Sequence, residues 1–95
     1  MPTHEELAAF VRDYARLSGP QRQLFQRAVD AFVTDLAARR AFRPGLRVKG
    51  VRGKPGVYEM TWAADGRATF RYGASIREKD PHITWLRVGT HEIFE

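Results

Sequence analysis

The chain has 95 residues, 43% hydrophobic and 28% charged, which is the composition of a single soluble domain with a small core. It contains no cysteine, which excludes disulfide bonds, thiolate metal sites and thiol catalysis. No apolar run reaches the roughly 18 residues of a membrane helix, and the first residues lack the basic and apolar segments of a signal peptide. A cytoplasmic protein that does not contact membranes is expected.

The net charge of +5 is concentrated in the middle of the chain. Residues 1–40 hold six basic and five acidic side chains, residues 41–72 hold seven and two, and residues 73–95 hold three and four. The seven middle cations are Arg43, Arg47, Lys49, Arg52, Lys54, Arg67 and Arg71. A localised patch of this kind binds polyanions such as RNA, and it also attracts acidic proteins.

Two helices are predicted in the first 40 residues. Apolar side chains recur at helical spacing in residues 3–17, where Thr3 and Glu6 have the spacing of a capping box. After a Ser-Gly-Pro break, Ser18 begins a second capping box, and the helix that follows is expected to end near Arg39. The short break between two amphipathic helices predicts an antiparallel helical hairpin.

After Pro44 the hydrophobic period changes from that of a helix to that of a strand. Four strands are expected, at residues 46–51, 57–62, 67–72 and 82–88. Two helices followed by such a meander predict one α+β domain. In this domain the helical hairpin of residues 1–40 packs on a mainly antiparallel sheet of three to four strands, and residues 46–94 supply the sheet and a C-terminal tail.

Alternation separates an apolar from a polar face on the two middle strands. Met60 and Phe70 are expected to face the helices, whereas Glu59, Arg67 and Arg71 face the opposite side. The Ala-Asp-Gly sequence between these strands predicts a three-residue hairpin loop. That loop would place Glu59 opposite Arg71, so a surface ion pair is the alternative to a catalytic role for both.

The polar face and the C-terminal tail together hold the groups that cleave RNA without a metal. In this reaction a base removes the proton of the 2′-hydroxyl, cations stabilise the phosphate, and an acid protonates the leaving 5′-oxygen. Histidine transfers protons at neutral pH, and arginine binds phosphate bidentately. The candidates are His91 as acid or base, Arg67 with Arg71 and Arg87 as phosphate-binding cations, and Glu59 as a second proton-transfer group.

Further residues are candidates for binding RNA rather than for catalysis. Arg47, Lys49, Arg52 and Lys54 are expected to contact its backbone, and an aromatic residue, Phe94 or alternatively Tyr72, is expected to stack on an extruded base. The structural alternatives are a packing role for the C-terminal histidine and a role for Phe94 in fixing the chain end. The three histidines are too scattered for a zinc site, and no cofactor is expected.

These motifs resemble the RelE/ParE toxins of type II toxin–antitoxin systems, HigB-like members among them. The resemblance rests on a Gly-Val-Tyr-Glu strand, a Gly-Arg-x-x-Phe strand and a terminal Gly-Thr-His-Glu-Ile-Phe segment, and it covers residues 46–94. It implies ribosome-dependent mRNA cleavage that inhibits translation and arrests growth. It also implies that Arg67 contacts the scissile phosphate, that His91 is an acid or base, and that Phe94 is the terminal aromatic residue.

Two features differ from the family pattern. Members usually have a strand before the first helix, whereas here the first helix is expected to begin at Thr3. Glu59 and Thr61 replace basic residues on one strand. The cations are then expected at other positions, namely Lys49, Arg52, Lys54 and Arg71.

The resemblance also implies a partner. This would be a cognate antitoxin, expected to be a helix-turn-helix protein, whose acidic amphipathic segment covers the basic face or the adjoining helical hairpin. Gyrase-poisoning relatives share the fold without the nuclease residues. The alternative function is therefore a non-nuclease binding module, either a gyrase inhibitor or an inactive relative.

Overall fold

The computed structural model describes residues 2–77 and 79–94, which form five strands, two α-helices and two 3₁₀ helices. In chain order these are β1 (Thr3–Glu6), α1 (Ala8–Arg16), α2 (Gly19–Ala37), η1 (Pro44–Leu46), β2 (Lys49–Gly50), β3 (Tyr58–Thr61), β4 (Gly66–Gly73), β5 (His82–Thr90) and η2 (His91–Phe94). Neither of the described α-helices is long and apolar enough to cross a membrane.

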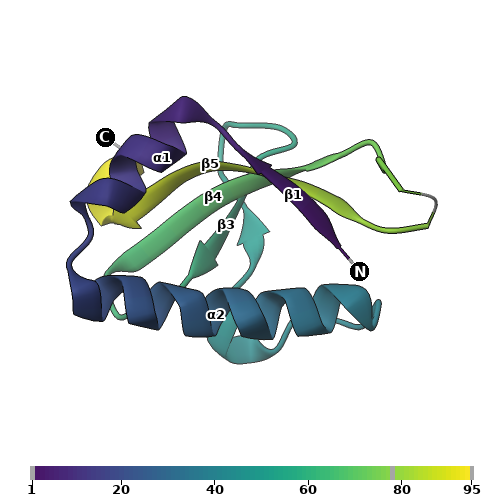
Figure 1. The fold of residues 1–95 in the computed structure, drawn as a ribbon, viewed down its shortest axis with the longest axis horizontal. Coiled ribbons are helices and arrows are strands. Elements are labelled where there is room, and N and C mark those ends of the chain that lie inside the picture. Colours follow the sequence, from purple (N-terminus) through teal and green to yellow (C-terminus); the bar gives the residue numbers. More distant parts are fainter. Residues whose placement is uncertain (1, 78, 95) are drawn as a thin grey trace.

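The strands form one sheet in the order β1-β5-β4-β3-β2. β1 is parallel to β5, and the other neighbours are antiparallel. Figure 1 shows α2 lying along the long axis of the molecule and α1 near the C-terminal end of β5. The predicted α+β class is confirmed, but the prediction of three to four strands was wrong because the described sheet has five.

Aromatic side chains fill the space between the helices and the sheet. Trp85 contacts Phe10 of α1, Phe25 and Phe32 of α2, and Phe70 of β4, with ring centroids 5.5 to 6.0 Å apart. Three of these pairs are tilted or edge-to-face and the pair with Phe10 is stacked; aromatic pairs contribute about 0.5–1.5 kcal/mol each beyond the burial of their area. Because both helices contact the same tryptophan, they cover the same face of the sheet, and the opposite face of β2 to β4 is left for other contacts.

The first element is a strand, so the prediction of a helix beginning at Thr3 was wrong. Thr3 Oγ1 lies 2.8 Å from Nδ1 of His82, and Glu5 Oε1 lies 2.9 Å from Nε2 of the same ring. These contacts fix β1 against β5 at polar positions that the sequence alone leaves without partners. The helix begins only after Leu7, whose N–H donates to the carbonyl of Trp85 at 3.0 Å. The strand that the sequence predicted to be missing is present.

The second helix begins as predicted. The N–H of Gln21 donates to Ser18 Oγ at 3.2 Å, and the N–H of Ser18 donates to Gln21 Oε1 at 2.8 Å, which completes a capping box. The helix ends at Ala37, and Arg39 then adopts a left-handed conformation with φ of 54°. The two consecutive helices predicted for residues 1–40 are thus present, preceded by β1.

The hairpin of β3 and β4 has a register two residues away from the predicted one. Thr61 lies opposite Arg67 instead of Thr69. The cause is a longer connection, in which the N–H of Gly66 donates to the carbonyl of Ala63 at 3.0 Å. Because the shift is an even number of residues, every side chain keeps its predicted face.

The shift does separate Glu59 from Arg71, and the prediction of a pair between them was wrong. The carboxylate of Glu59 instead lies 3.8 Å from Nζ of Lys49 on β2. Arg71 lies opposite Thr84 on β5, toward the other end of β4. The polar face therefore has two regions, of which only the one near the hairpin turn includes Glu59.

Candidate nucleic-acid interface and active site

The sheet face opposite the helices is hollowed where β2, β3 and β4 approach η2. This depression, called the cationic hollow below, has a volume of about 380 Å³. Eight of the ten predicted site residues line it: Arg47, Lys49, Arg52, Lys54, Glu59, Arg67, His91 and Phe94. The structure therefore brings together residues that lie up to 47 positions apart in the sequence.

The end of β5 delivers His91 to the cationic hollow. Arg67 pairs with Gly89, two residues before His91. A Cβ at Gly89 would lie 2.9 Å from Ile93, so a side chain there would push η2 away from the end of the strand. In η2 the ring centroids of His91 and Phe94 are 5.6 Å apart. The imidazole and an aromatic ring thus lie side by side at one wall of the hollow.

The guanidinium of Arg67 is fixed by the turn that precedes it. Its Nη1 donates to the carbonyl oxygens of Ala63, Ala64 and Gly66 at 3.3, 3.4 and 2.9 Å. Arginine has five N–H donors, and no other acceptor for Arg67 occurs among the described residues. The remaining donors can bind a phosphate from an orientation that the backbone has already set.

The lining of the hollow is strongly positive. Five of its side chains are lysine or arginine, and Glu59 is its one carboxylate among the described residues. The Glu59 side chain is only 14% exposed, and the ammonium group of Lys49 is close to it. No cluster of three or more His, Cys, Asp or Glu side chains suited to a metal ion occurs in the described part of the chain. The arrangement suits a polyanion and proton transfer.

The structure does not bring Arg87 to the hollow. By register Arg87 lies opposite Thr69. Its guanidinium nevertheless reaches α1, which follows β1 along the edge of β5. There Nε and Nη2 donate to the carboxylate of Asp13 at 2.5 and 3.1 Å, and this bonding raises the pKa of Arg87. The same carboxylate accepts from the N–H of Val88 at 3.2 Å. Arg87 thus has a structural partner that its sequence position did not reveal.

Arg71 also lies outside the lining of the hollow, as a result of the shifted register. It is exposed, on the part of β4 that neighbours Thr84 and, beyond it, β1. The pKa of Glu5 on β1 is lowered, chiefly by its hydrogen bond with His82 and to a smaller extent by the charge of Arg71. The catalytic role predicted for Arg71 therefore has no support from the geometry.

Arg27 and Thr61 belong to this region but were not among the predicted site residues. Thr61 lines the cationic hollow, and Arg27 on α2 lines an adjoining hollow that also includes Arg47 and Arg67. Arg27 was missed because the charges of residues 1–40 nearly cancel, so no patch was expected there. Its place in the second hollow depends on how α2 packs beside the sheet, where Leu24, one turn earlier, is an exposed apolar residue.

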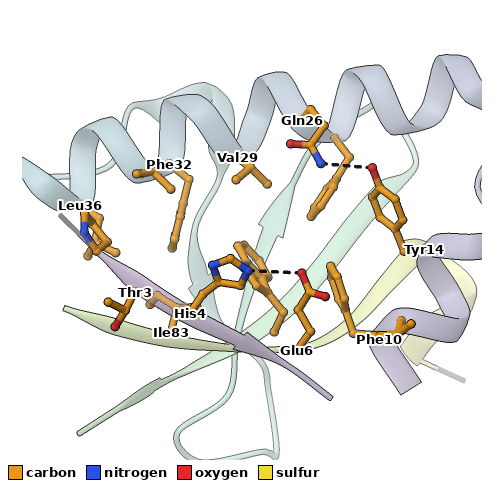
Figure 2. A pocket seen from close by; sticks show the side chains of 15 residues that line it. Thr3, His4, Glu6, Phe10, Tyr14, Gln26, Val29, Phe32, Leu36 and Ile83 are labelled. Atoms are coloured by element: carbon orange, nitrogen blue, oxygen red, sulfur yellow. Dashed lines mark hydrogen bonds and ion pairs between the residues drawn. The ribbon is translucent and has the colours of Figure 1, made fainter. Parts of the chain in front are cut away.

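The other side of the molecule carries a groove of different chemistry. It lies between β1 and α2, has a volume of about 360 Å³, and has no lysine or arginine in its lining. Figure 2 shows aromatic and aliphatic side chains facing it, with two polar pairs at its rim. Gln26 Nε2 donates to the hydroxyl of Tyr14 at 3.2 Å, and His4 lies 3.3 Å from Glu6. This groove is unsuited to phosphate.

No family model matches the sequence, and no curated protein is significantly similar to it. Solved structures do match. A toxin from Helicobacter pylori superposes with a TM-score of 0.65 at 16% identity, over 100% of both chains. A chain of the E. coli DinJ–YafQ toxin–antitoxin complex gives 0.66 at 14%, over 97% of this chain and 94% of that chain. A chain of the E. coli RelBE toxin–antitoxin complex gives 0.62 at 13%, over 95% and 96%.

The chain has the fold of the RelE/ParE toxins. The structural match includes the helical half of the chain, whereas the sequence resemblance covered only residues 46–94. Because β1 precedes α1, the order of elements agrees with the RelE pattern. The prediction that this chain lacks the N-terminal strand of the family was wrong.

Proposed function

We propose that this chain is the toxin of a type II toxin–antitoxin system and a metal-independent endoribonuclease that cleaves mRNA on the ribosome. The observation that carries the proposal is the cationic hollow, in which His91, Glu59 and Arg67 converge with four further cations. The shared fold supports it, because the solved chains with this fold are toxins.

In this proposal His91 and Glu59 transfer the two protons of the reaction. One of them removes the proton of the 2′-hydroxyl, whose oxygen attacks the adjacent phosphorus. The other protonates the 5′-oxygen as its bond to phosphorus breaks, which leaves a 2′,3′-cyclic phosphate and a 5′-hydroxyl. The two groups reach the hollow from η2 and β3, so they approach the phosphate from different elements.

Arg67 stabilises the charge that develops on the phosphate. Its Nη1 is already bonded to three carbonyl oxygens, so little reorganisation is needed when the transition state forms. Arg52 and Lys54 contact the RNA backbone, and Phe94 stacks on the base next to the scissile phosphate. Arg71 and Arg87 have no part in this mechanism, because neither lines the hollow.

Mapping of mRNA 5′ ends on ribosomes, together with growth after induced expression, tests the proposal. The wild-type chain is expected to arrest growth and to produce new cuts at codons in the ribosomal A site. His91→Ala should abolish both without loss of folded protein, because His91 is exposed in η2. His4→Ala is the matched control, since His4 is an exposed histidine on β1 outside the hollow. A His91→Ala variant that still cuts mRNA would contradict the role of His91.

The partner in this proposal is an antitoxin with a helix-turn-helix domain and an acidic segment that covers the cationic hollow. DinJ and RelB are the antitoxins crystallised with their toxins in the matching complexes. Complementary charge would speed association and make its rate fall with salt. The chain would then be silent while the antitoxin is bound and active after it is removed.

A non-nuclease binding module is the second candidate. It is favoured by the contacts that two site residues make within the protein: Arg67 donates to three backbone carbonyls, and Glu59 lies 3.8 Å from Lys49. In that case both residues are structural and the face holds a protein such as gyrase. Induction of the SOS response without new mRNA ends would favour this candidate, and cuts in the A site would exclude it.

A further inference from the structure

A second hollow adjoins the cationic hollow on the side of α2. The second hollow has a volume of about 540 Å³ and shares Arg47, Thr61 and Arg67 with the first. It extends from these residues to Leu24 and Arg27 on α2. Because Arg67 lines both, the two hollows lie side by side with Arg67 between them. A chain-like ligand with a phosphate on Arg67 could extend toward either hollow.

Two cations lie along the second hollow. Arg27 is exposed on α2 and makes no hydrogen bond or ion pair within the described part of the chain. Arg47 is exposed directly after η1, in a left-handed conformation with φ of 46°. Both cations are therefore available to bind the phosphates of a ligand that extends from Arg67 toward α2.

An apolar surface accompanies these cations. Leu24 is 44% exposed and lies one helical turn before Arg27, so the two side chains are neighbours on the surface of α2. The side chain of Ala28 continues this surface toward the sheet. A cation beside an apolar patch matches a nucleotide, which presents a phosphate and the flat face of a base.

We infer that the second hollow is a subsite for the RNA strand on one side of the scissile phosphate, with Arg27 on a backbone phosphate and Leu24 against a base. This inference rests on the proposed function. RNA is favoured over a separate acidic protein because the second hollow adjoins the first at Arg67, so a strand with its scissile phosphate on Arg67 reaches the second hollow as it continues. The opposite flank of the RNA passes Lys54 and Phe94.

Short RNA oligonucleotides with 2′-O-methyl groups, which cannot be cleaved by attack of the 2′-oxygen, provide the test. Binding of a trinucleotide is compared with binding of hexanucleotides extended at the 5′ end or at the 3′ end, by fluorescence anisotropy across a salt series. Extension at one end only should tighten binding about tenfold, through the added phosphate contact with Arg27 and the apolar contact of a base with Leu24. Arg27→Glu should remove this gain and leave the trinucleotide unaffected, and the salt slope should fall by about 0.7 for each phosphate that the variant no longer binds.

Arg12→Glu is the matched control, because Arg12 is exposed on α1, lies outside both hollows and undergoes the same change of charge. It should leave all the affinities unchanged. Equal affinities for short and extended oligonucleotides, or equal losses in Arg12→Glu and Arg27→Glu, would overturn the subsite while leaving the proposed nuclease intact. A loss of antitoxin affinity alone in Arg27→Glu would also overturn it. If the wild-type chain binds none of the oligonucleotides, the subsite is overturned, whereas the proposed function is decided separately by the mapping of mRNA 5′ ends on ribosomes.

Discussion

The two faces of the sheet have opposite properties although the same strands build them. On β4, Ala68 and Phe70 are completely buried beneath the helices, while Arg67 and Arg71 alternate with them on the other side. The first face is closed by aromatic packing, and the second is hollow and positively charged. The alternation of a strand thus separates the packed face from the face that we propose to bind RNA. Substitutions on the two faces should therefore give different kinds of defect.

The separation is incomplete at the second half of β5. There α1 replaces β1 beside the strand, and the ladder between β4 and β5 is irregular at Thr69 and Phe70. Asp13 of α1 accepts hydrogen bonds from the guanidinium of Arg87 and from the backbone of Val88. A charged pair therefore contributes to the fold at this edge, so charge alone does not identify the binding face.

The largest effect on stability is expected from Phe70→Ala. Phe70 is fully buried and its ring contacts those of Phe32, Tyr58, Tyr72 and Trp85. The cavity left behind should lower the free energy of unfolding by about 3–5 kcal/mol, measured by urea denaturation. Arg71→Ala, at the next position on the opposite face, should change it by less than about 0.5 kcal/mol. Similar losses in the two variants would contradict the division between the faces.

A smaller loss is expected from Asp13→Ala. Removing the carboxylate leaves the N–H of Val88 without its acceptor and the guanidinium of Arg87 without its partner, which should cost about 1–3 kcal/mol. Arg87→Ala should cost less, because the Arg87 side chain is 43% exposed whereas that of Asp13 is only 9% exposed. In a cleavage assay corrected for folded protein, Arg87→Ala should be as active as the wild type. A specific loss of cleavage in Arg87→Ala would restore the catalytic role predicted from the sequence.

The stability should also depend on pH through Asp35, which is 2% exposed at the end of α2. Its pKa is held well below the usual range, chiefly by hydrogen bonds from the side chain and backbone of Arg43 and further by Arg40. Because the pKa is lower in the folded state, the contribution of Asp35 is complete above the unfolded pKa of about 3.9 and is lost as the pH falls below it. Thermal melts of the wild type and Asp35→Asn should therefore converge between about pH 5 and pH 2. A constant difference across that range would show that the carboxylate charge is not involved.

Much of the fold followed from local sequence patterns. The capping box at Ser18 and the faces of the strands that carry Glu59 and Arg67 depend on residues close in the chain, and the structure contains both. β1 was missed because Thr3 and Glu5 are both hydrogen-bonded to His82, which is 79 residues from Thr3 in the sequence. Its Thr3–Glu6 spacing also imitates the start of a helix.

The candidate site was predictable to the extent that strand alternation and the C-terminal tail define it. Eight of the ten residues line the cationic hollow, because an error of two residues in register keeps each side chain on its face. The same error placed Arg71 beside Glu59. Arg27 and the Asp13–Arg87 pair were missed because each depends on how a helix packs against the sheet. No periodicity within one segment contains that information.

The smallest effect on stability, and the sharpest on binding, is expected from Lys49→Glu combined with Arg52→Glu. Both side chains are exposed at the cationic hollow, and Lys49 makes only a 3.8 Å ion pair with Glu59, worth about 0–1 kcal/mol. The folded state should therefore survive with a nearly unchanged free energy of unfolding. Affinity for the antitoxin and for ribosomes should fall, and the association rate should lose most of its dependence on salt.

Arg12→Glu with Arg16→Glu is the control for this reversal, because it makes the same change in net charge on α1, outside the hollow. It should leave both affinities close to those of the wild type, since charges more than about 10 Å apart are largely screened at 0.1 M salt. A reversal at Lys49 and Arg52 that changes neither affinity across the salt titration would mean that this face is only a solvated surface. The comparison between the two faces would then describe how the chain folds and not where it binds.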